Sequence, residues 1–164
     1  MRSPKQPLTV QQATNRAAAL CARSEQAPDD IRNKLMDWGI GRTDAISIVS
    51  DLKAQGFVDE QRYARAFVKD RFAFNGWGRI KIEHQLRLKG ISADAIAQAM
   101  TAIDEQQYCE RLVDLLRAKW RTVSQREPRA AWAALMRFAI SRGFETSIAA
   151  QCARQVTQTD GEQD

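Results

Sequence analysis

The chain has 164 residues, of which 44% are hydrophobic and 27% charged, and its formal net charge is +5. This composition predicts a folded protein and excludes a disordered one, and the positive charge favours acidic partners such as nucleic acids. Three scattered cysteines and a single histidine exclude a disulfide framework and a zinc site, and the absence of a long apolar segment excludes a secretory signal and a membrane span, so we expect a cytoplasmic protein.

Helical periodicity runs along almost the whole chain, and no alternating strand pattern interrupts it. Thr9 is a good N-cap for a first helix that runs to about Ala22. Pro28 suits the first turn of a second helix, which we expect to end at Gly39. A third helix follows and ends at Gly56, so the first part of the chain contains three helices in a row.

The same order of signals returns after this glycine. Asp59 is an N-cap for a fourth helix, and a break at residues 75–78 separates that helix from a fifth. The fifth helix runs from about Arg79 and ends at Gly90, and Ser92 caps a short sixth helix. The second part of the chain therefore also contains three helices.

The remaining sequence predicts a third group of helices. Asp104 caps a longer seventh helix, and an eighth begins at Pro128 and ends at Gly143. We expect either Thr146 or Ser147 to cap the last helix, because both have a hydroxyl that can accept a bond from a backbone amide.

These signals recur with a regular spacing, which predicts internal repeats. The segment Asp59–Ala64 resembles Asp104–Cys109, and the helix-ending glycines Gly39, Gly90 and Gly143 are 51 and 53 residues apart. Such a period is typical of helical arrays in which neighbouring repeats share a core. We therefore predict an all-α fold of three tandem three-helix repeats, each similar to a helix-turn-helix unit, in an elongated, curved array. Its predicted parts are a flexible N-terminus over 1–8, repeats over 9–57, 58–102 and 103–156, and a disordered acidic tail over 157–164.

No residue combination in the sequence predicts a catalytic site. The lone His84 lies four residues from both Ile80 and Leu88, which favours a packed or half-exposed structural histidine. Residues 76–79 (Gly-Trp-Gly-Arg) open a helix and could approach a phosphate, but without a Walker lysine we interpret them as an inter-helix loop. We expect a protein that acts by binding, with no catalytic residue, metal or cofactor.

Two tyrosines occupy equivalent positions near the starts of two long helices. Tyr63 and Tyr108 could stack on nucleic acid bases. We favour the alternative that they pack at the joints between repeats, because the same position recurs beside an inward-facing apolar stripe.

The positive charge is concentrated in two segments. Residues 59–90 contain eight Lys or Arg against four Asp or Glu, residues 110–142 contain eight against three, and residues 91–109 contain no basic residue. Stacked repeats would align these side chains as a track, which could follow a phosphate backbone or meet an acidic protein groove. The candidate partner-binding or DNA-binding residues are Arg62, Arg65, Lys69, Arg71, Arg79, Lys81, Arg87, Lys89, Arg117, Lys119 and Arg121.

A family resemblance is centred on the middle of the chain. Its motifs are Gly56-Phe57-x-Asp59, Tyr63-Ala64-x-x-Phe67-Val68-x-x-Arg71, Gly76-x-Gly78-x-Ile80 and Leu86-x-x-Lys89-Gly90-Ile91. Together with an Arg-Gly-Phe turn near the C-terminus, this combination resembles the RecX family of recombination regulators. The resemblance covers most of residues 28–156.

The resemblance implies a cytoplasmic bacterial protein that takes part in DNA recombination, DNA repair and the SOS response. It implies binding to the RecA protein and to RecA–DNA filaments, in the groove or at the growing end, with inhibition of filament extension, ATP hydrolysis, strand exchange and co-protease activity. It brings no catalytic residue. The matched positions that are available to a partner are Tyr63, Arg65, Lys69, Arg71, Arg79, Lys81 and Lys89.

Two other functions fit the residues taken alone. A helix-turn-helix regulator would act directly on duplex DNA, although no helix begins with an obvious base-reading cluster. A protein scaffold would use its basic charge for solubility only. Binding to single-stranded or double-stranded DNA alone stays open, and we expect a monomer because the sequence has no spare apolar heptad.

Overall fold

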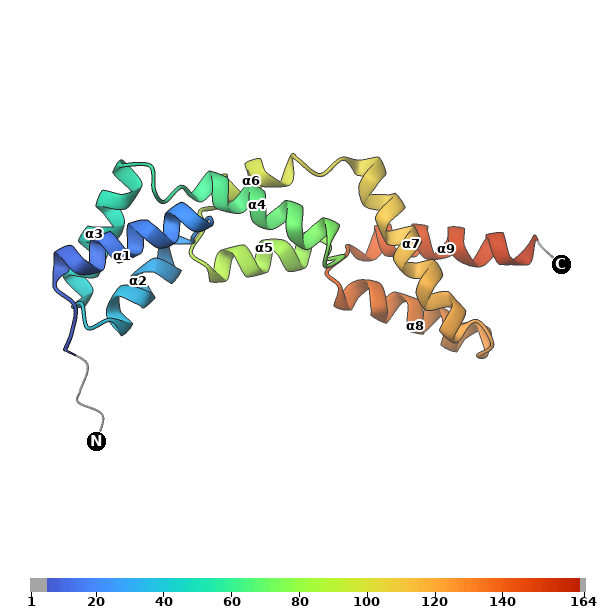
Figure 1. The fold of residues 1–164 in the computed structure, drawn as a ribbon. Helices are drawn as coiled ribbons and strands as arrows, with labels where there is room; N and C mark the ends of the chain where they lie inside the picture. Colours follow the sequence, from blue (N-terminus) through green and yellow to red (C-terminus); the bar gives the residue numbers. More distant parts are fainter. Residues whose placement is uncertain (1–5, 163–164) are drawn as a thin grey trace, which may run out of the picture. The chain divides into compact units, whose positions relative to one another are not determined.

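The computed structural model describes residues 6–162, and all regular secondary structure in this range is helical (Figure 1). The predicted all-α fold is confirmed. The helices are α1 (Val10–Arg23), α2 (Pro28–Asp37), α3 (Arg42–Ala54), α4 (Glu60–Ala73), α5 (Arg79–Leu88), α6 (Ala93–Met100), α7 (Glu105–Val123), α8 (Pro128–Ser141) and α9 (Thr146–Gly161). No helix within residues 6–162 is both long and apolar enough to cross a membrane.

Backbone contacts divide the chain into two compact units. Unit 1 comprises the chain up to Ala66 together with Leu86–Ala97, and unit 2 comprises Phe67–Gln85 together with the chain from Gln98 onward. The division falls within α4, α5 and α6, so that the predicted middle repeat contributes to both units. The repeat boundaries stay a prediction.

Unit 1 is built around α1, α2 and α3, which pack against one another (Figure 1). Thr9 and Gln12 form a capping box at the start of α1, in which the Gln12 amide donates to Thr9 Oγ1 over 3.2 Å. Pro28 occupies the first turn of α2, as the sequence predicts. The core consists of small and branched side chains, namely Ala13, Ala17, Ile31, Leu35, Ile40, Ala45, Ile48, Val49, Leu52 and Val58.

The predicted flexible N-terminus lies in part outside the described residues. Of the described part, Leu8 is half-buried against the core of unit 1, and its amide donates to the Trp38 carbonyl over 3.2 Å. Leu8 is therefore attached to the fold, because its apolar side chain and a backbone bond fix it at the end of α2. The polar composition of the segment contains no signal for this contact.

Unit 2 is built around α7, α8 and α9, which also pack pairwise (Figure 1). Asp104 caps α7 by accepting a hydrogen bond from the Gln107 amide over 3.0 Å. The largest fully buried side chains of these helices and their connections are Tyr108, Leu112, Leu116, Val123, Leu135 and Phe144. The aromatic pair among them lies where α7 meets the turn between α8 and α9.

The last helix differs from the sequence prediction at both ends. It continues to Gly161, although we expected a disordered tail from residue 157. Val156 is buried and Trp120 Nε1 donates to the Asp160 carboxylate, so that tertiary contacts extend the helix beyond its apolar residues. The N-cap is Glu145, and neither predicted hydroxyl occupies this position.

The turn glycines connect successive predicted repeats in the same way in both units. In unit 1, Gly90 of the α5–α6 turn has φ of 76°, and a Cβ there would lie 2.3 Å from Asp29 Oδ2 at the start of α2. In unit 2, Gly143 of the α8–α9 turn has φ of 90°, and a Cβ there would lie 2.3 Å from the Lys81 Cβ at the start of α5. Each turn therefore packs against the start of the middle helix in the preceding predicted repeat.

Candidate functional site

The structure divides the predicted basic residues into three groups by their contacts. The first group forms ion pairs within a unit, the second lies against aromatic rings, and the third is exposed. The groups are Arg62, Arg79 and Lys89; Arg71, Lys81 and Lys119; and Arg65, Lys69, Arg87, Arg117 and Arg121. These contacts indicate which side chains are available to a partner.

Two of the ion-paired residues stabilise unit 1. Arg62 Nε lies 3.0 Å from Glu25 Oε1, and its Nη2 donates to the Gly56 carbonyl over 2.9 Å. Lys89 Nζ lies 3.0 Å from Asp30 Oδ2. Both pairs join segments that are distant in the sequence. The contacts of Arg62 and Lys89 therefore explain their presence without a partner molecule.

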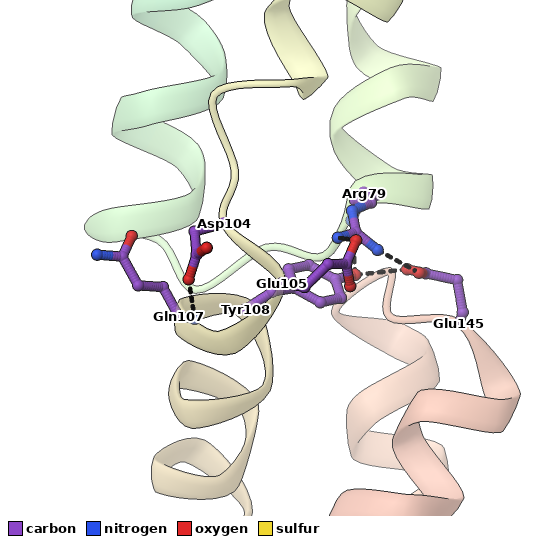
Figure 2. A network of polar contacts seen from close by, with 6 residues as sticks. All are labelled: Arg79, Asp104, Glu105, Gln107, Tyr108 and Glu145. Atoms are coloured by element: carbon purple, nitrogen blue, oxygen red, sulfur yellow. Dashed lines mark hydrogen bonds and ion pairs between the residues drawn. The ribbon is translucent and has the colours of Figure 1, made fainter.

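Arg79 belongs to a polar network in unit 2 (Figure 2). Its guanidinium pairs with the Glu105 carboxylate and with Glu145 Oε2, the latter at 3.0 Å, and lies over the Tyr108 ring at 3.9 Å from the centroid. Its backbone amide donates to the Tyr108 hydroxyl over 3.0 Å, and that hydroxyl donates to Glu145. Two carboxylates thus compensate the charge of Arg79.

Tyr108 is completely buried in this network. Its ring stacks with Phe72 at 5.8 Å and lies against Phe144 at 5.1 Å between centroids. Burial, followed by the hydrogen bond to Glu145, raises the pKa of the phenol above its ordinary range. No face of this ring is open to a base. Tyr63 is half-buried, and both of its alternatives remain predictions.

Basic side chains surround the loop between α4 and α5 in unit 2. Arg71 Nη1 donates to Asn75 Oδ1 over 3.3 Å, and Arg142 Nη1 donates to the Asn75 carbonyl over 2.8 Å. Arg111 Nη2 donates to the Ala73 carbonyl over 3.2 Å. Three guanidinium groups therefore bind the same short loop, and the loop offers them an amide side chain and carbonyl oxygens.

A fourth cation reaches the loop through Trp77. Lys81 Nζ lies 4.5 Å and Arg71 Cζ 5.1 Å from the centre of the indole ring, close enough for cation–π attraction. We name Arg71, Lys81, Arg111 and Arg142 the loop cluster. All four side chains are half-buried, and within residues 6–162 none of them forms an ion pair with a carboxylate.

The loop itself is held by backbone bonds. The amide of Trp77 donates to the Arg71 carbonyl over 3.0 Å, and the amide of Gly78 donates to the Arg142 carbonyl over 2.7 Å. These amides are consequently occupied, which favours an inter-helix loop over an amide-lined phosphate site.

A basic groove continues from the loop cluster between α7 and α8. The Phe138 ring lies under the Arg142 guanidinium at 5.2 Å and near Lys119 Nζ at 5.8 Å. Lys119 and Phe138 line a surface groove with Arg126 and Arg137. We name this second set, Lys119, Arg126, Arg137 and Phe138, the α7–α8 groove. Arg142 thus links the loop cluster to the groove, because its guanidinium binds Asn75 of the loop and lies over Phe138 of the groove.

The sequence-based list of candidate residues omitted three residues whose side chains hold the loop cluster and the Arg79 network together. They are Arg111, Arg142 and Glu145. Arg142 occupies the position before a turn glycine, as Lys89 does one repeat earlier, so the repeat pattern contains a signal for it. Arg111 has no such signal, because its role depends on the packing of α7 under the loop. Glu145 is the N-cap residue of α9, but its carboxylate binds Arg79 and Tyr108 and leaves the helix without a side-chain cap.

His84 is exposed, which corrects the expected packed or half-exposed environment. It lies on α5 with Ile80 and Leu88, whose side chains are also exposed, so this stripe faces away from the core. Among residues 6–162 no group of His, Cys, Asp and Glu is arranged to hold a metal ion.

Comparisons with known proteins agree on one family. A family model described as "RecX, second three-helix domain" matches residues 59–100. The regulatory protein RecX of Xanthomonas campestris pv. campestris (strain B100) is 31% identical over 110 residues, which are 67% of this chain and 67% of that protein. The RecX of Xanthomonas axonopodis pv. citri (strain 306) is 32% identical over the same length.

Solved structures share the fold. The crystal structure of RecX from Lactobacillus salivarius has a TM-score of 0.81 at 17% identity, over 91% of this chain and 97% of that one. A second crystal structure of a regulatory protein RecX has the same TM-score at 21% identity, over 87% of this chain and 72% of the other. With relatives above 30% identity along two thirds of their length, the chain belongs to the RecX family of regulatory proteins.

Proposed function

We propose that the protein regulates RecA by binding to it and to its filaments on DNA. Bound in the filament groove or at the growing end, it inhibits filament extension and thereby ATP hydrolysis, strand exchange and co-protease activity. The observation that carries this proposal is membership of the RecX family, whose named relatives are regulatory proteins.

Exposed basic side chains support the proposal and narrow the residues involved. Arg65 and Lys69 lie one turn apart on α4, and Arg117 and Arg121 lie one turn apart on α7. All four are exposed, and none has a partner within residues 6–162. Such side chains keep their charge available to a protein or DNA surface. Arg62, Arg79 and Lys89 are less suitable, because their contacts are internal.

The test is RecA-catalysed ATP hydrolysis on single-stranded DNA while the protein is added below one molecule per RecA protomer. We expect hydrolysis to fall well before equal amounts are reached, because blocking one filament end stops the extension of many protomers. Unchanged hydrolysis, with filaments present, would reject RecA regulation. Specific protection of a palindromic duplex site would then favour the direct DNA-binding regulator.

Charge reversal of the two exposed pairs tests where the partner binds. For Arg65→Glu with Lys69→Glu, and for Arg117→Glu with Arg121→Glu, we expect half-inhibition to need roughly tenfold more protein, because losing about 1.4 kcal/mol weakens binding tenfold. The matched control is Arg23→Glu with Arg42→Glu, two exposed arginines of α1 and α3 outside the predicted site. If the control weakens inhibition as much as the α4 and α7 pairs, the effect is one of net charge.

A further inference from the structure

The loop cluster lacks the compensation by carboxylates that Arg79 of the same unit receives. Arg79 binds two carboxylates, whereas Arg71, Lys81, Arg111 and Arg142 contact only carbonyl oxygens, one amide side chain and aromatic rings within the described chain. Half-buried charges are partly removed from water, and an uncompensated group of them produces a positive potential that favours an anion. The arrangement therefore indicates an anionic ligand.

The contacts also fix the positions of these cations. Two guanidinium groups bind Asn75 and one binds the Ala73 carbonyl, while Lys81 lies against the ring of Trp77. Bonds of this kind hold long side chains in one place, so that less conformational entropy is lost when a ligand binds. The Nε atom of Arg111 is buried without a partner in the structure. These features distinguish the loop cluster from solvated surface charge.

An exposed aromatic residue lies in the segment that the arginines of the loop cluster bind. Phe74 stands between Ala73 and Asn75, the two residues that bind the arginines, and 81% of its surface is exposed. It is the most exposed of the large hydrophobic side chains in the described chain. An exposed aromatic ring on a segment bound by fixed cations matches the requirements of single-stranded nucleic acid, whose phosphates bind the cations and whose bases stack on the ring.

We propose that the loop cluster and the α7–α8 groove form a binding site for single-stranded nucleic acid. The cations of the loop cluster bind phosphates, a base stacks on Phe74, and the strand continues past Arg142 and Phe138 into the groove lined by Lys119, Arg126 and Arg137. This inference rests on the proposed function only for its biological setting, because a recombination filament contains single-stranded DNA.

The exposed ring favours a single strand over the other polyanions. In a duplex the bases are stacked on one another and offer no free face to Phe74, whereas a single strand can turn one base outward. An acidic protein surface would bind the cations but would gain little affinity from the exposed Phe74 ring. The two alternatives therefore differ in their dependence on Phe74.

The test measures binding of a fluorescent oligothymidine of about 20 nucleotides to the full chain by anisotropy, without RecA. We expect affinity to fall steeply with salt, with a logarithmic slope of about −3 if four to five phosphates are neutralised. Phe74→Ala should weaken binding by about 5- to 150-fold, since stacking contributes about 1–3 kcal/mol per base, and Phe74→Tyr should restore it.

Charge reversal in the α7–α8 groove provides a second test of the same binding site. Lys119→Glu with Arg126→Glu and Arg137→Glu should weaken binding on the order of 100-fold. The matched control is Arg23→Glu, Arg42→Glu and Arg154→Glu, which changes the net charge equally at exposed positions outside the site. All six substituted side chains are exposed or half-exposed, five of them on helices and Arg126 in the turn between α7 and α8, and circular dichroism would verify the fold of each variant.

Three results would overturn the inference: equal losses in the groove variant and its control, duplex binding as tight as single-strand binding with no effect of Phe74→Ala, or equally effective competition by polyglutamate. The last result would assign the surface to an acidic protein. Because RecA is absent from this measurement, failure here leaves inhibition of RecA hydrolysis intact, and failure of that inhibition leaves oligothymidine binding intact.

Discussion

Gly143→Ala is expected to lower the free energy of unfolding by about 2 to 5 kcal/mol. Two costs combine at this position. The backbone has φ of 90°, which costs an L-residue about 1–2 kcal/mol. The added Cβ would also lie 2.3 Å from the Lys81 Cβ and 2.6 Å from its backbone nitrogen, and relief of such overpacking costs about 1–3 kcal/mol more. Urea unfolding, followed by circular dichroism, measures the sum.

Gly56 separates the two costs. It has φ of 80°, but a Cβ there would meet no atom within 4 Å, so Gly56→Ala should cost only the backbone term of about 1–2 kcal/mol. Gly90→Ala should be intermediate, because its closest neighbour is the Asp29 carboxylate, which can rotate away. Equal destabilisation by Gly143→Ala and Gly56→Ala would contradict a close contact between the α8–α9 turn and the start of α5.

Tyr108→Phe is expected to destabilise the protein by about 1.5–3 kcal/mol at neutral pH, the typical value for a hydrogen bond to a charged group. The substitution removes the donor to Glu145 and leaves the Arg79 amide without its acceptor. The ring remains in place between Phe72 and Phe144, so packing is retained. The measurement is again urea unfolding.

The same residue predicts a pH dependence at the alkaline end. Because folding raises the pKa of Tyr108, the folded state favours the neutral phenol, and this contribution is complete below the ordinary pKa of about 10. It is lost as the pH rises above that value, since the unfolded chain releases the proton first. Stability of the wild type should therefore fall above pH 10 more steeply than that of Tyr108→Phe, by up to about 1.4 kcal/mol per pH unit.

Ultraviolet absorbance of tyrosinate checks this directly, because the chain has only two tyrosines. The difference between the wild type and Tyr108→Phe reports Tyr108 alone. Its ionisation should occur above the ordinary pKa and coincide with unfolding. A difference titration centred near pH 10 in the folded protein would show that the hydroxyl is accessible and that the network with Glu145 is weak in solution.

Much of the fold follows from local sequence signals. The caps at Thr9 and Asp104, the proline at the start of α2 and the glycines after α2, α5 and α8 lie where the sequence places them. These features depend on one or two residues and their backbone conformation, so they can be recognised without tertiary information. The end of α9 depends on Trp120 contacting Asp160, which no local pattern contains.

The candidate site was less predictable than the fold, because tertiary contacts decide which basic side chains are available. Charge and helical spacing identify Arg79 and Arg71 as equivalent basic candidates, yet one binds two carboxylates and the other binds an amide and two rings. Whether a basic side chain is compensated depends on Glu105 and Glu145, which are 26 and 66 residues away from Arg79 in the sequence. Composition therefore detects a basic surface, and only tertiary contacts show which charges remain available.

The contact between a turn glycine and the start of a helix bears on how the number of repeats can change during evolution. The neighbouring helix can approach Gly90 and Gly143 closely because glycine has no side chain. Each predicted repeat contains both parts of this contact, a turn glycine and a helix start. A duplicated gene segment would inherit both parts together. The added repeat could then pack against its neighbours without a new interface. A change in the number of repeats would require only recombination within the gene.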